Sequence, residues 1–443
     1  MTRAVVDQSR RERLIRKLAG LLVRGVYRRV DVFRMEEDEG GPRLSVSNHF
    51  GGFTDPLLLV YAMPRVPRIL ARDVIWRTPI VRSIMNWAGA IPVHKPEDRG
   101  AGSNDVMFGS AYSALAEGSH LLIFPEGITR DEPSIAPLKT GAARIVLGAR
   151  ANGVEGIHII PSGIHYEDKA SLRSSVSVLV GRSIDIDATI DDYVASGGDE
   201  SPENHAAVRS LTDAIETELR RVAPDFADWA EARTLTVGAE IVLRTLSDDP
   251  RDEIPLAGRD ALAGHLGRKP AATKSRVVGA IDRYTTELSN MGLDDAQLLS
   301  GITGRQFLLR SVVSLVLTLV LMPFALVGAA INWIPYLLVK AVGFLRMAPA
   351  MMSTIKPLSA MLVFGATWGL VLWGVLHEYG GRGAALAGLL MPLYLASVIV
   401  VVEAVQVLWT SFATWRRLRG ARSSEDLLEA RRREVLDVLV EAI

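Results

Sequence analysis

The sequence predicts an α/β domain, followed by a helical subdomain and a C-terminal membrane segment. Three observations lead to this fold class. Short apolar stretches alternate with helical patterns over residues 31–190, long uncharged stretches follow residue 305, and the hydrophobic share of 49% is high for a purely soluble chain. Because charged residues still make up 23% of the 443 residues, a soluble body must accompany the membrane part.

The charge balance and the cysteine count exclude several classes of protein. Lys and Arg together number 50, as do Asp and Glu, and this balance argues against a dedicated nucleic-acid binder. The sequence has no cysteine, which excludes disulfide scaffolds, cysteine zinc sites and an acyl-enzyme on a Cys nucleophile. The eight histidines form no pair with metal-ligand spacing, so we expect no metal site.

Residues 1–30 predict a basic amphipathic helix on a membrane surface. Nine Lys or Arg residues accompany two acidic residues here, and apolar residues recur at helical spacing from Leu14 to Val26. Such a helix suits an anionic bilayer surface. The alternative is a docking helix whose arginines face water. A secretory signal peptide does not fit, because charges interrupt the apolar stretch.

Residues 31–190 predict the α/β domain. Four apolar stretches have the length and composition of buried strands, and helical patterns such as 56–62 and 111–117 separate them. Unusual polar residues follow the carboxyl ends of these strands, where ligands of α/β sheets bind, so together they predict a site. The predicted strands are residues 43–47, 89–93, 120–124 and 157–160, and the polar groups are Asn48-His49, His94-Lys95, Pro125-Glu126-Gly127 and Pro161-Ser162-Gly163.

Residues 191–304 predict a helical subdomain whose role the sequence does not reveal. One helix within it has an apolar face that recurs from Val208 to Val222.

Residues 305–410 predict the membrane segment. A bilayer core of about 30 Å needs about 20 apolar residues per helix, so the uncharged stretches 357–376 and 384–402 predict a pair of transmembrane helices. A loop over residues 377–383 joins them. A basic cluster begins residues 411–443, which predict a cytoplasmic amphipathic tail helix.

The uncharged stretch 311–339 has a different character. Pro323, Asn332 and Pro335 interrupt it, and basic residues flank both of its ends. Since basic residues prefer the cytoplasmic side, a re-entrant or interfacial segment satisfies this pattern better than a single crossing.

His49 and Asp55 are the first candidates for chemistry. A histidine can take a proton from a hydroxyl when another group fixes its tautomer, and a carboxylate six positions on can do so across a glycine turn. Asp55 before Pro56 is also an ordinary helix start with Asp as the N-cap, and His49 alone could be a structural histidine. The two roles of Asp55 can coexist, and spacing alone leaves both open.

Four ordered blocks of motifs lie between residues 43 and 187. They are Asn48-His49 to Asp55-Pro56, Arg72 to Lys95, Phe124 to Arg130 with its continuation to Arg144, and Ile160 to Ile164. Together the blocks resemble the glycerolipid acyltransferase family, which includes bacterial lysophosphatidate acyltransferases. The five residues between His49 and Asp55 look like the fungal-type subgroup that acts on glycerol 3-phosphate or dihydroxyacetone phosphate, and residues 332–335 look similar to that subgroup too.

The resemblance implies a mixed sheet with flanking helices that transfers an acyl group to an oxygen of a phosphorylated glycerol. His49 would be the general base for the acceptor hydroxyl, and Asp55 would orient it. The hydroxyl would attack the acyl thioester directly, without an acyl-enzyme. Asn48, Glu126 and Gly127 would be structural or acceptor-positioning residues.

Phosphate binding requires fixed cations or backbone N–H groups. The candidates that the resemblance implies are Lys95, Arg130, Arg72 and Lys139, of which Arg72 and Lys139 could each instead be a solvated surface charge. The residues expected to shape the acyl channel are Ile160, Pro161, Ser162 and Gly163.

The implied partners are an acyl thioester donor, a glycerol 3-phosphate or lysophospholipid acceptor and membrane lipids. Acyl-CoA or acyl-carrier protein would be a co-substrate, and we expect no other cofactor. We expect an integral protein of the cell membrane with its catalytic domain on the cytoplasmic face. One alternative is an acyltransferase for lysophosphatidate, another lysophospholipid or a glycolipid, and another is a non-catalytic lipid-binding membrane protein. The sequence contains no Gly-x-Ser-x-Gly motif, which argues against a hydrolase.

Overall fold

The structure, a computed structural model, divides the chain into two compact units. It describes residues 9–38, 40–94, 104–168, 173–186, 190, 201–249, 252–300, 304–345, 349–421 and 425–443. The first unit comprises Met1–Thr236 and Pro255–Lys269, and the second comprises Val237–Ile254 and Pro270–Ile443.

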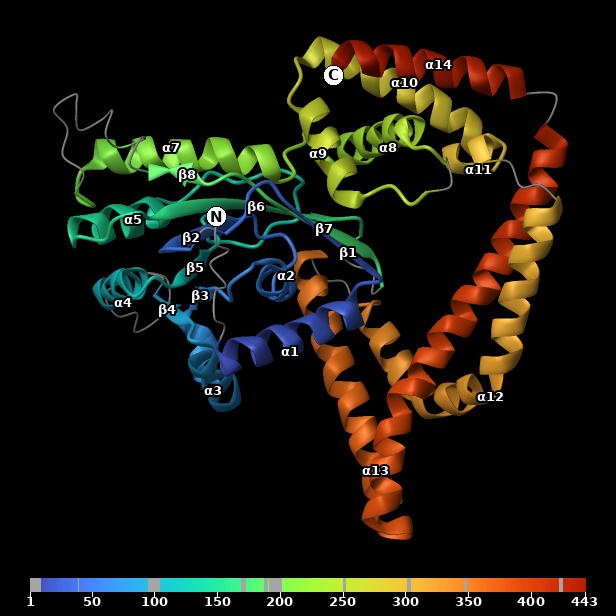
Figure 1. The fold of residues 1–443 in the computed structure, drawn as a ribbon, viewed down its shortest axis with the longest axis horizontal. Helices are drawn as coiled ribbons and strands as arrows, with labels where there is room; N and C mark the ends of the chain where they lie inside the picture. Colours follow the sequence, from blue (N-terminus) through green and yellow to red (C-terminus); the bar gives the residue numbers. More distant parts are fainter. Residues whose placement is uncertain are drawn as a thin grey trace, which may run out of the picture. The chain divides into compact units, whose positions relative to one another are not determined.

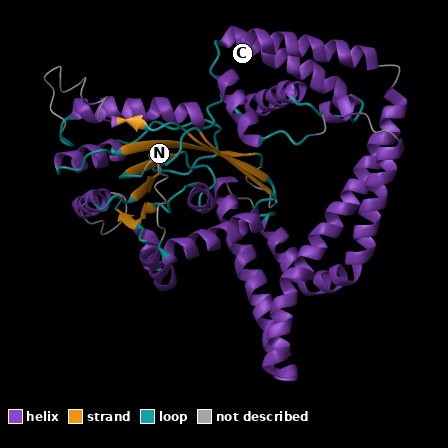
Figure 2. Cartoon of the chain, in the orientation of Figure 1, coloured by secondary structure: helices purple, strands orange, loops and turns teal. Residues whose placement is uncertain are grey.

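The first unit contains a mixed sheet with flanking helices, which confirms the predicted fold class (Figures 1 and 2). Over the described residues the sheet has eight strands in the order β1-β7-β6-β2-β5-β3-β4, with β8 paired to β6. Strands β6, β2, β5, β3 and β4 run parallel, and β7 and β8 run antiparallel to β6. The bounds are β1 Arg29–Arg34, β2 Arg43–Ser47, β3 Arg68–Arg72, β4 Ile91–Val93, β5 His120–Ile123, β6 His158–Tyr166, β7 Ser175–Val180 and β8 Ile184–Asp185.

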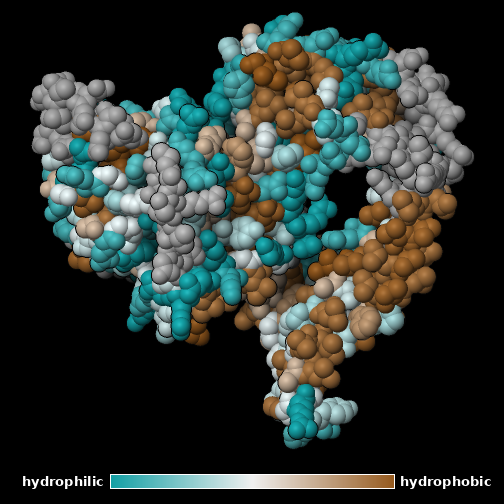
Figure 3. All heavy atoms as spheres, in the orientation of Figure 1, coloured by the Kyte–Doolittle hydropathy of each residue, from teal (hydrophilic) through white to brown (hydrophobic). Residues whose placement is uncertain are grey.

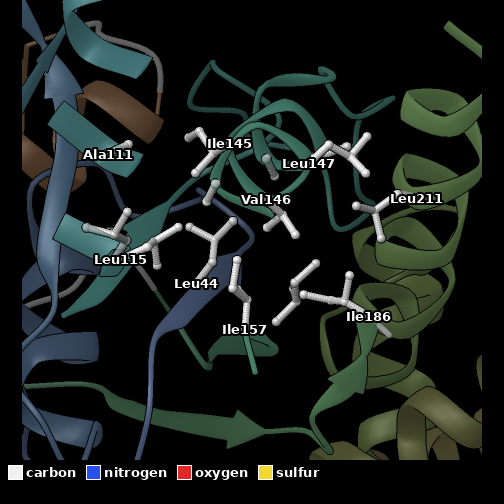
Figure 4. Close-up of a cluster of buried hydrophobic side chains, with 14 of the residues drawn as sticks. Leu44, Ala111, Leu115, Ile145, Val146, Leu147, Ile157, Ile186 and Leu211 are labelled. Carbon is white, nitrogen blue, oxygen red and sulfur yellow. The ribbon is translucent and has the colours of Figure 1, made fainter. Parts of the chain in front are cut away.

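Three helices cover one face of the sheet. Alternate residues of a strand point to the same face, so Leu44 and Val46 of β2 both lie in this core. Figure 4 shows Leu44 gathered with side chains of the covering helices, among them Leu115, Ile145 and Leu211. Burying each large aliphatic side chain contributes roughly 1.5–3 kcal/mol, which makes this cluster a main source of stability. The helices are α4 (Asp105–Ala116), α5 (Gly141–Ala151) and α7 (His205–Val222).

Helices α1 (Arg10–Val26) and α2 (Thr54–Ala62) belong to the opposite core. Leu58 and Leu59 of α2 are fully buried there, in one cluster with Leu122 of β5. The sheet is therefore covered on both faces, as the sequence predicts.

The predicted N-terminal helix is present as α1. It begins with a capping box, in which the Ser9 hydroxyl accepts from the Glu12 N–H and the Glu12 carboxylate accepts from the Ser9 N–H. Ala19 and Val23 on one side of the helix are buried. The docking alternative therefore describes this face, while a membrane-surface role for residues 1–30 stays a prediction.

The helical region expected over residues 191–304 does not form one subdomain. In the first unit, α7 and α9 (Leu256–Gly267) pack on β7, where Leu179 clusters with Leu219 and Ala257. A helical pattern shows that one face is buried but does not say against which partner, so the sequence could not reveal this division. The remaining helices of the region are α8 (Trp229–Leu246), which crosses the boundary between the units, and α10 (Ala271–Asn290) and α11 (Asp295–Ser300) of the second unit.

The C-terminal helix α14 (Glu425–Ala442) packs on α10 and is part of the second unit. The buried Arg432 donates to the Asp295 carboxylate at 2.7 Å and to the Thr245 hydroxyl at 2.8 Å. Asp295 also accepts from the Tyr284 hydroxyl at 2.6 Å. Because removal of one partner from a buried ion pair costs about 3–5 kcal/mol, this network fixes the tail helix in place.

Two helices of the second unit are long and apolar enough to cross a membrane, as judged over the described residues. The candidate spans are Ser311–Val342 in α12 (Gly304–Val342) and Thr354–Thr410 in α13 (Pro349–Ala421). Figure 3 shows hydrophobic residues along these helices and hydrophilic residues at the tip of the α13 hairpin.

Helix α13 reverses direction at Gly380, whose φ of 70° and ψ of −175° are not helical. A residue other than glycine rarely adopts such a φ. The predicted loop over 377–383 is therefore wrong, because helical structure continues on both sides of one kinked residue. The predicted transmembrane stretches 357–376 and 384–402 form the two arms of this hairpin.

Helix α12 is continuous but bends between its ends in Figure 1. Pro323 and Pro335 lie inside it, and each proline removes a backbone hydrogen bond. A bent helix of this kind fits the expected re-entrant or interfacial segment over 311–339, which stays a prediction.

Asn332 joins α12 to α13. Its side chain is buried, donates to the Gly328 carbonyl at 2.8 Å and accepts from the Trp368 indole N–H at 2.9 Å. A Cβ at Gly328 would lie 2.3 Å from the Tyr394 carbonyl oxygen. A small residue and a satisfied amide thus let the two apolar helices pack closely.

Strand β6 makes a close backbone contact with the end of α7. A Cβ built on Gly163 would lie 1.9 Å from the carbonyl oxygen of Val222, and the His165 ring donates from Nε2 to that same oxygen at 2.6 Å. The contact involves backbone atoms, which cannot turn away as a flexible side chain can.

We predict that Gly163→Ala destabilises the protein by roughly 3 kcal/mol or more, because β6 and α7 must separate to admit a methyl group. The matched control is Gly109→Ala on α4, where nothing lies within 4 Å and helix propensity favours alanine by about 1 kcal/mol. Thermal unfolding of the full chain in detergent measures both variants. A Gly163→Ala midpoint equal to that of wild type would contradict the packing.

His120 makes the stability of the first unit depend on pH. Burial lowers the pKa of His120 to about 3, whereas the unfolded value is about 6.5. Below pH 6.5 the unfolded chain takes up a proton that the folded chain excludes, so the free energy of unfolding falls as the pH drops from about 6.5 towards 3, by up to roughly 1.4 kcal/mol per pH unit. We predict that His120→Gln flattens this slope in denaturation series between about pH 7 and 5. His205→Gln, at an exposed position of α7, should keep the wild-type slope, and equal slopes for both variants would refute the assignment.

Candidate active site

The site begins where β2 ends. Asn48 is fully buried, and its side chain both donates to the Ile164 carbonyl at 3.0 Å and accepts from the Ile164 N–H at 2.8 Å. The side-chain amide thus bonds to the β6 backbone and extends the pairing of β2 with β6 beyond the end of β2. It holds the next residue, His49, at the carboxyl edge of the sheet. Both polar atoms of the Asn48 side chain thus bond to the β6 backbone, and its expected structural or acceptor-positioning role stays a prediction.

His49 and Asp55 form a hydrogen-bonded pair. The Nδ1 atom of His49 lies 2.7 Å from Oδ2 of Asp55, and the side-chain exposures are 21% and 0%. A buried carboxylate accepts, so Nδ1 carries the hydrogen and Nε2 is the nitrogen able to take a proton. The exposed fraction of the imidazole lets a substrate reach it.

Asp55 is satisfied by groups from three parts of the domain. The Gly51 N–H donates to Oδ2 at 2.9 Å and to Oδ1 at 3.1 Å, and the Tyr166 hydroxyl donates to Oδ1. The expected N-cap role of Asp55 is wrong, because α2 begins at Thr54 and Asp55 makes no capping hydrogen bond. The carboxylate is instead devoted to the histidine and the preceding turn.

Gly51 is required at this turn because its neighbours leave no space. A Cβ there would lie 2.2 Å from the Tyr166 hydroxyl and 2.7 Å from Oδ1 of Asp55. Burial, and then the charge of Asp55, raise the pKa of Tyr166 well above its usual range. Tyr166 therefore remains a protonated donor at physiological pH.

Glu126 supports the histidine from the neighbouring strand. It follows β5, and its carboxylate accepts from the His49 N–H at 3.0 Å and from the Ala136 N–H at 2.9 Å. Burial raises the pKa of Glu126, while these two N–H groups oppose that rise. The contacts identify a structural carboxylate. The Phe124 ring stacks on the imidazole with centroids 4.2 Å apart.

Two of the expected phosphate ligands lie in the loop after β5. The Lys139 side chain passes over Gly127, where a Cβ would lie 3.0 Å from the lysine Cδ. Gly127 has a φ of 66°, which a glycine adopts without strain. The Arg130 guanidinium forms an ion pair with Glu132, and the backbone N–H of Arg130 donates to the His49 carbonyl at 3.3 Å. Lys95 lies outside the described residues.

Arg72 ends β3, on the same edge of the sheet. Ile69 pairs with Leu122, and Leu122 pairs with Ser45, so Arg72 lies level with Asn48 at a distance of two strands. Two strand spacings amount to roughly 10 Å, which a long side chain can partly bridge.

The fourth motif block lies inside β6. Ile160, Pro161, Ser162 and Gly163 are all buried. Ile160 lies in the core that contains Leu58 and Leu59 of α2, whereas Gly163 lies against the end of α7. Ser162 pairs in register with Ser47, beside the end of β2. Their expected part in an acyl channel stays a prediction.

Sequence analysis did not single out two groups of this cluster, the Gly51 N–H and Tyr166. Tyr166 stands two residues beyond the fourth block, at the end of β6, and only the antiparallel sheet and the α2 turn bring it to Asp55. Among the residues described here, no group of three or more His, Asp or Glu side chains could hold a metal ion.

Comparison with known proteins gives a family match over the site. Residues 28–165 match the family model described as Acyltransferase. Glycerol-3-phosphate O-acyltransferase 2 of Saccharomyces cerevisiae is 25% identical over 218 residues, which cover 49% of this chain and 28% of that protein. Glycerol-3-phosphate O-acyltransferase 1 of the same yeast is 30% identical over 125 residues, covering 28% of this chain and 16% of the relative.

N-acylphosphatidylethanolamine synthase of Arabidopsis thaliana is 32% identical over 116 residues, covering 24% of this chain and 39% of the plant protein. The matches thus span between 16% and 39% of the lengths of these relatives. The solved structure of the 1-acyl-sn-glycerophosphate acyltransferase PlsC from Thermotoga maritima aligns with a TM-score of 0.34 at 15% identity, over 47% of this chain and 77% of that one.

The class of protein follows from the fold and the family match together. Residues 28–165 run from the start of β1 to the end of β6 and include the His49–Asp55 pair, so this part of the chain is an acyltransferase domain. The family match and the yeast relatives support the resemblance of the four motif blocks to the glycerolipid acyltransferase family.

We predict that Tyr166→Phe lowers kcat for acyl transfer roughly tenfold and leaves KM nearly unchanged, because it removes one hydrogen bond to the charged Asp55. The measurement is turnover of labelled acyl-CoA by the full chain. Tyr61→Phe on α2 is the matched control and should keep wild-type kcat. If both variants are equally active, Tyr166 does not position the pair.

Proposed function

We propose that the chain is a membrane-bound O-acyltransferase that moves a fatty acyl group from an acyl thioester to a glycerolipid acceptor. The observation that carries this proposal is the 2.7 Å contact between Nδ1 of His49 and the fully buried Asp55. A buried partner keeps the imidazole in one tautomer and stabilises the imidazolium once it forms.

The reaction needs one proton acceptor and no protein nucleophile. Nε2 of His49 takes the proton of the acceptor hydroxyl while its oxygen attacks the thioester carbonyl carbon. A carbon–oxygen bond forms, the carbon–sulfur bond breaks, and the imidazolium returns the proton to the departing thiolate. The Asp55 carboxylate offsets the charge of the imidazolium.

The phosphate of the acceptor requires cations near His49. The three-carbon skeleton of a glycerol phosphate is shorter than about 7 Å, the length of two residues of extended chain. When its hydroxyl is at His49, its phosphate must therefore lie close to the histidine. Arg130 and Lys139 come from the loop that also supplies Glu126, and Arg72 lies along the same edge. We assign these residues, with Lys95, as the phosphate ligands of the proposed site.

Glycerol 3-phosphate, acylated at its sn-1 hydroxyl, is the acceptor that we propose first. Two yeast relatives named glycerol-3-phosphate O-acyltransferase support it. The plant relative is named for synthesis of an N-acylphosphatidylethanolamine, so an amine acceptor is the second candidate. Lysophosphatidate is a third, since the same chemistry serves any accessible hydroxyl next to a phosphate.

We further propose that α13 crosses the membrane twice and that the acyltransferase domain faces the cytoplasm. The uncharged stretches 357–376 and 384–402 of its two arms are long enough for a bilayer core of about 30 Å. Arginines follow the second arm, at Arg416 and Arg417, and basic residues prefer the cytoplasmic side.

The test uses the purified full chain with labelled acyl-CoA or acyl-carrier protein as the donor. Glycerol 3-phosphate, dihydroxyacetone phosphate, lysophosphatidate and phosphatidylethanolamine are each offered as the acceptor. We predict that His49→Ala lowers the rate by about 10²- to 10⁴-fold, because the general base is lost. His205→Ala, at an exposed position of α7, should retain the wild-type rate.

Equal rates for wild type and His49→Ala would overturn the mechanism. A labelled product with only one acceptor would identify the substrate, and the absence of product with every acceptor and donor would favour a non-catalytic lipid-binding protein.

A further inference from the structure

Helix α3 (Pro79–Ala88) lies on the surface of the first unit and exposes three large apolar side chains. Pro79 stands at the first helical position and Gly89, with a φ of 76°, ends the helix, so both ends have the residues such positions favour. None of its residues is buried. Ile80, Ile84 and Trp87 are 74%, 55% and 41% exposed.

Two polar side chains of α3 make hydrogen bonds with the preceding segment. Arg82 donates from Nε to the Trp76 carbonyl at 2.8 Å, and Asn86 accepts from the Trp76 indole N–H at 2.8 Å. Both contacts lead to the short 3₁₀ helix η1 (Asp73–Arg77). Ile80, Ile84 and Trp87 instead recur at the i, i+4, i+7 spacing of a single stripe. Val81, Met85 and Ala88, beside this stripe, are half-buried. The apolar face of α3 is therefore wider than the part that the protein covers.

Helix α1 has a second stripe of the same spacing. Leu14, Leu18 and Leu21 are exposed, on a different side from the buried Ala19 and Val23. The two helices are neighbours: the Arg11 guanidinium lies 3.8 Å from the Cβ position of Gly89, and Figure 1 shows the N-terminal end of α1 beside α3.

The charges around the two stripes have one dominant sign. Exposed basic residues on α1 are Arg10, Arg11, Arg13, Lys17 and Arg24, whereas Glu12 is its single acidic residue. Arg77 and Arg82 add exposed positive charge beside the α3 stripe. Apolar stripes edged by basic residues and a tryptophan match the interface of an anionic bilayer, where the apolar side chains enter the acyl region and the cations meet phosphates.

We propose that the outward stripes of α1 and α3 form one docking surface by which the acyltransferase domain lies on an anionic lipid bilayer. The occupant is lipid rather than a partner protein, because the same chain carries apolar helices of membrane-spanning length and because the cations surround the stripes. The α3 stripe is the new element, since nothing in its contacts with the protein requires three large apolar side chains to face outward. The surface is separate from the residues of the His49 site, so it does not depend on the proposed reaction.

The absence of cysteine makes the test direct, because one introduced thiol is the only label position. The full chain carries Ile84→Cys or, as matched control, Val106→Cys, an apolar residue of α4 that is 75% exposed. Each thiol receives an environment-sensitive fluorophore, and the protein is reconstituted into vesicles of phosphatidylcholine and phosphatidylglycerol. Iodide quenches labels in water, and lipids with a nitroxide on the upper acyl chain quench labels in the bilayer.

We expect the label at position 84 to lose iodide quenching and to gain nitroxide quenching, while the label at position 106 shows the opposite pattern. Ile80→Glu, combined with Ile84→Cys, should restore iodide quenching, because a carboxylate enters the apolar stripe. Circular dichroism verifies that the helix content is unchanged.

Iodide quenching at position 84 equal to that at position 106 would overturn the proposal. Protection from iodide without nitroxide quenching would overturn it as well, because a second copy of the chain or another protein would then cover the stripe. Equal behaviour in vesicles of phosphatidylcholine alone would refute the role assigned to the basic residues.

Discussion

A carboxylate withdrawn from water must have its oxygens satisfied, and Asp55 meets this constraint with donors from three parts of the domain. His49 follows β2, Gly51 lies in the turn before α2, and Tyr166 ends β6. These contacts constrain the neighbouring chain. There is no space for a Cβ at Gly51, and the Asp55 carboxylate does not cap α2. The histidine is thus oriented before any substrate arrives, which is the condition for efficient proton transfer.

The proposed acyl transfer imposes a second constraint. Each buried methylene of an acyl chain contributes about 0.8 kcal/mol, so a long-chain product would leave a water-exposed site very slowly. Both units present apolar surface, through the α12 and α13 helices in the second and through the α1 and α3 stripes in the first. Two separate attachments of this kind would keep the acyltransferase domain at the lipid–water boundary without requiring a rigid link between the units.

Features that depend on neighbouring residues could be predicted. Strand β2, the buried face of α7 and the two arms of α13 follow from hydrophobic period and length. Asn48-His49 and Glu126 follow strands as expected, whereas Pro161-Ser162-Gly163 lie inside β6, which continues to Tyr166. Strands β1 and β3 went unrecognised because charged residues begin and end both, which hides the apolar alternation. The loop of α13 was misjudged because charges around Gly380 suggested irregular chain, whereas the helix needs only one glycine to reverse.

A periodic pattern records that a face is buried, but it does not name the partner. The sequence of neighbouring residues therefore determined which segments are helices or strands. It also determined that His49 and Asp55 are near each other and that the C-terminal part is apolar. Only the tertiary structure decided that Oδ1 of Asp55 accepts from Tyr166, 111 positions later. It also decided that the helices of residues 191–304 divide between two units and that the isoleucines of α3 are exposed. Contacts of this kind depend on how the whole sheet assembles, and no short window of sequence contains that information.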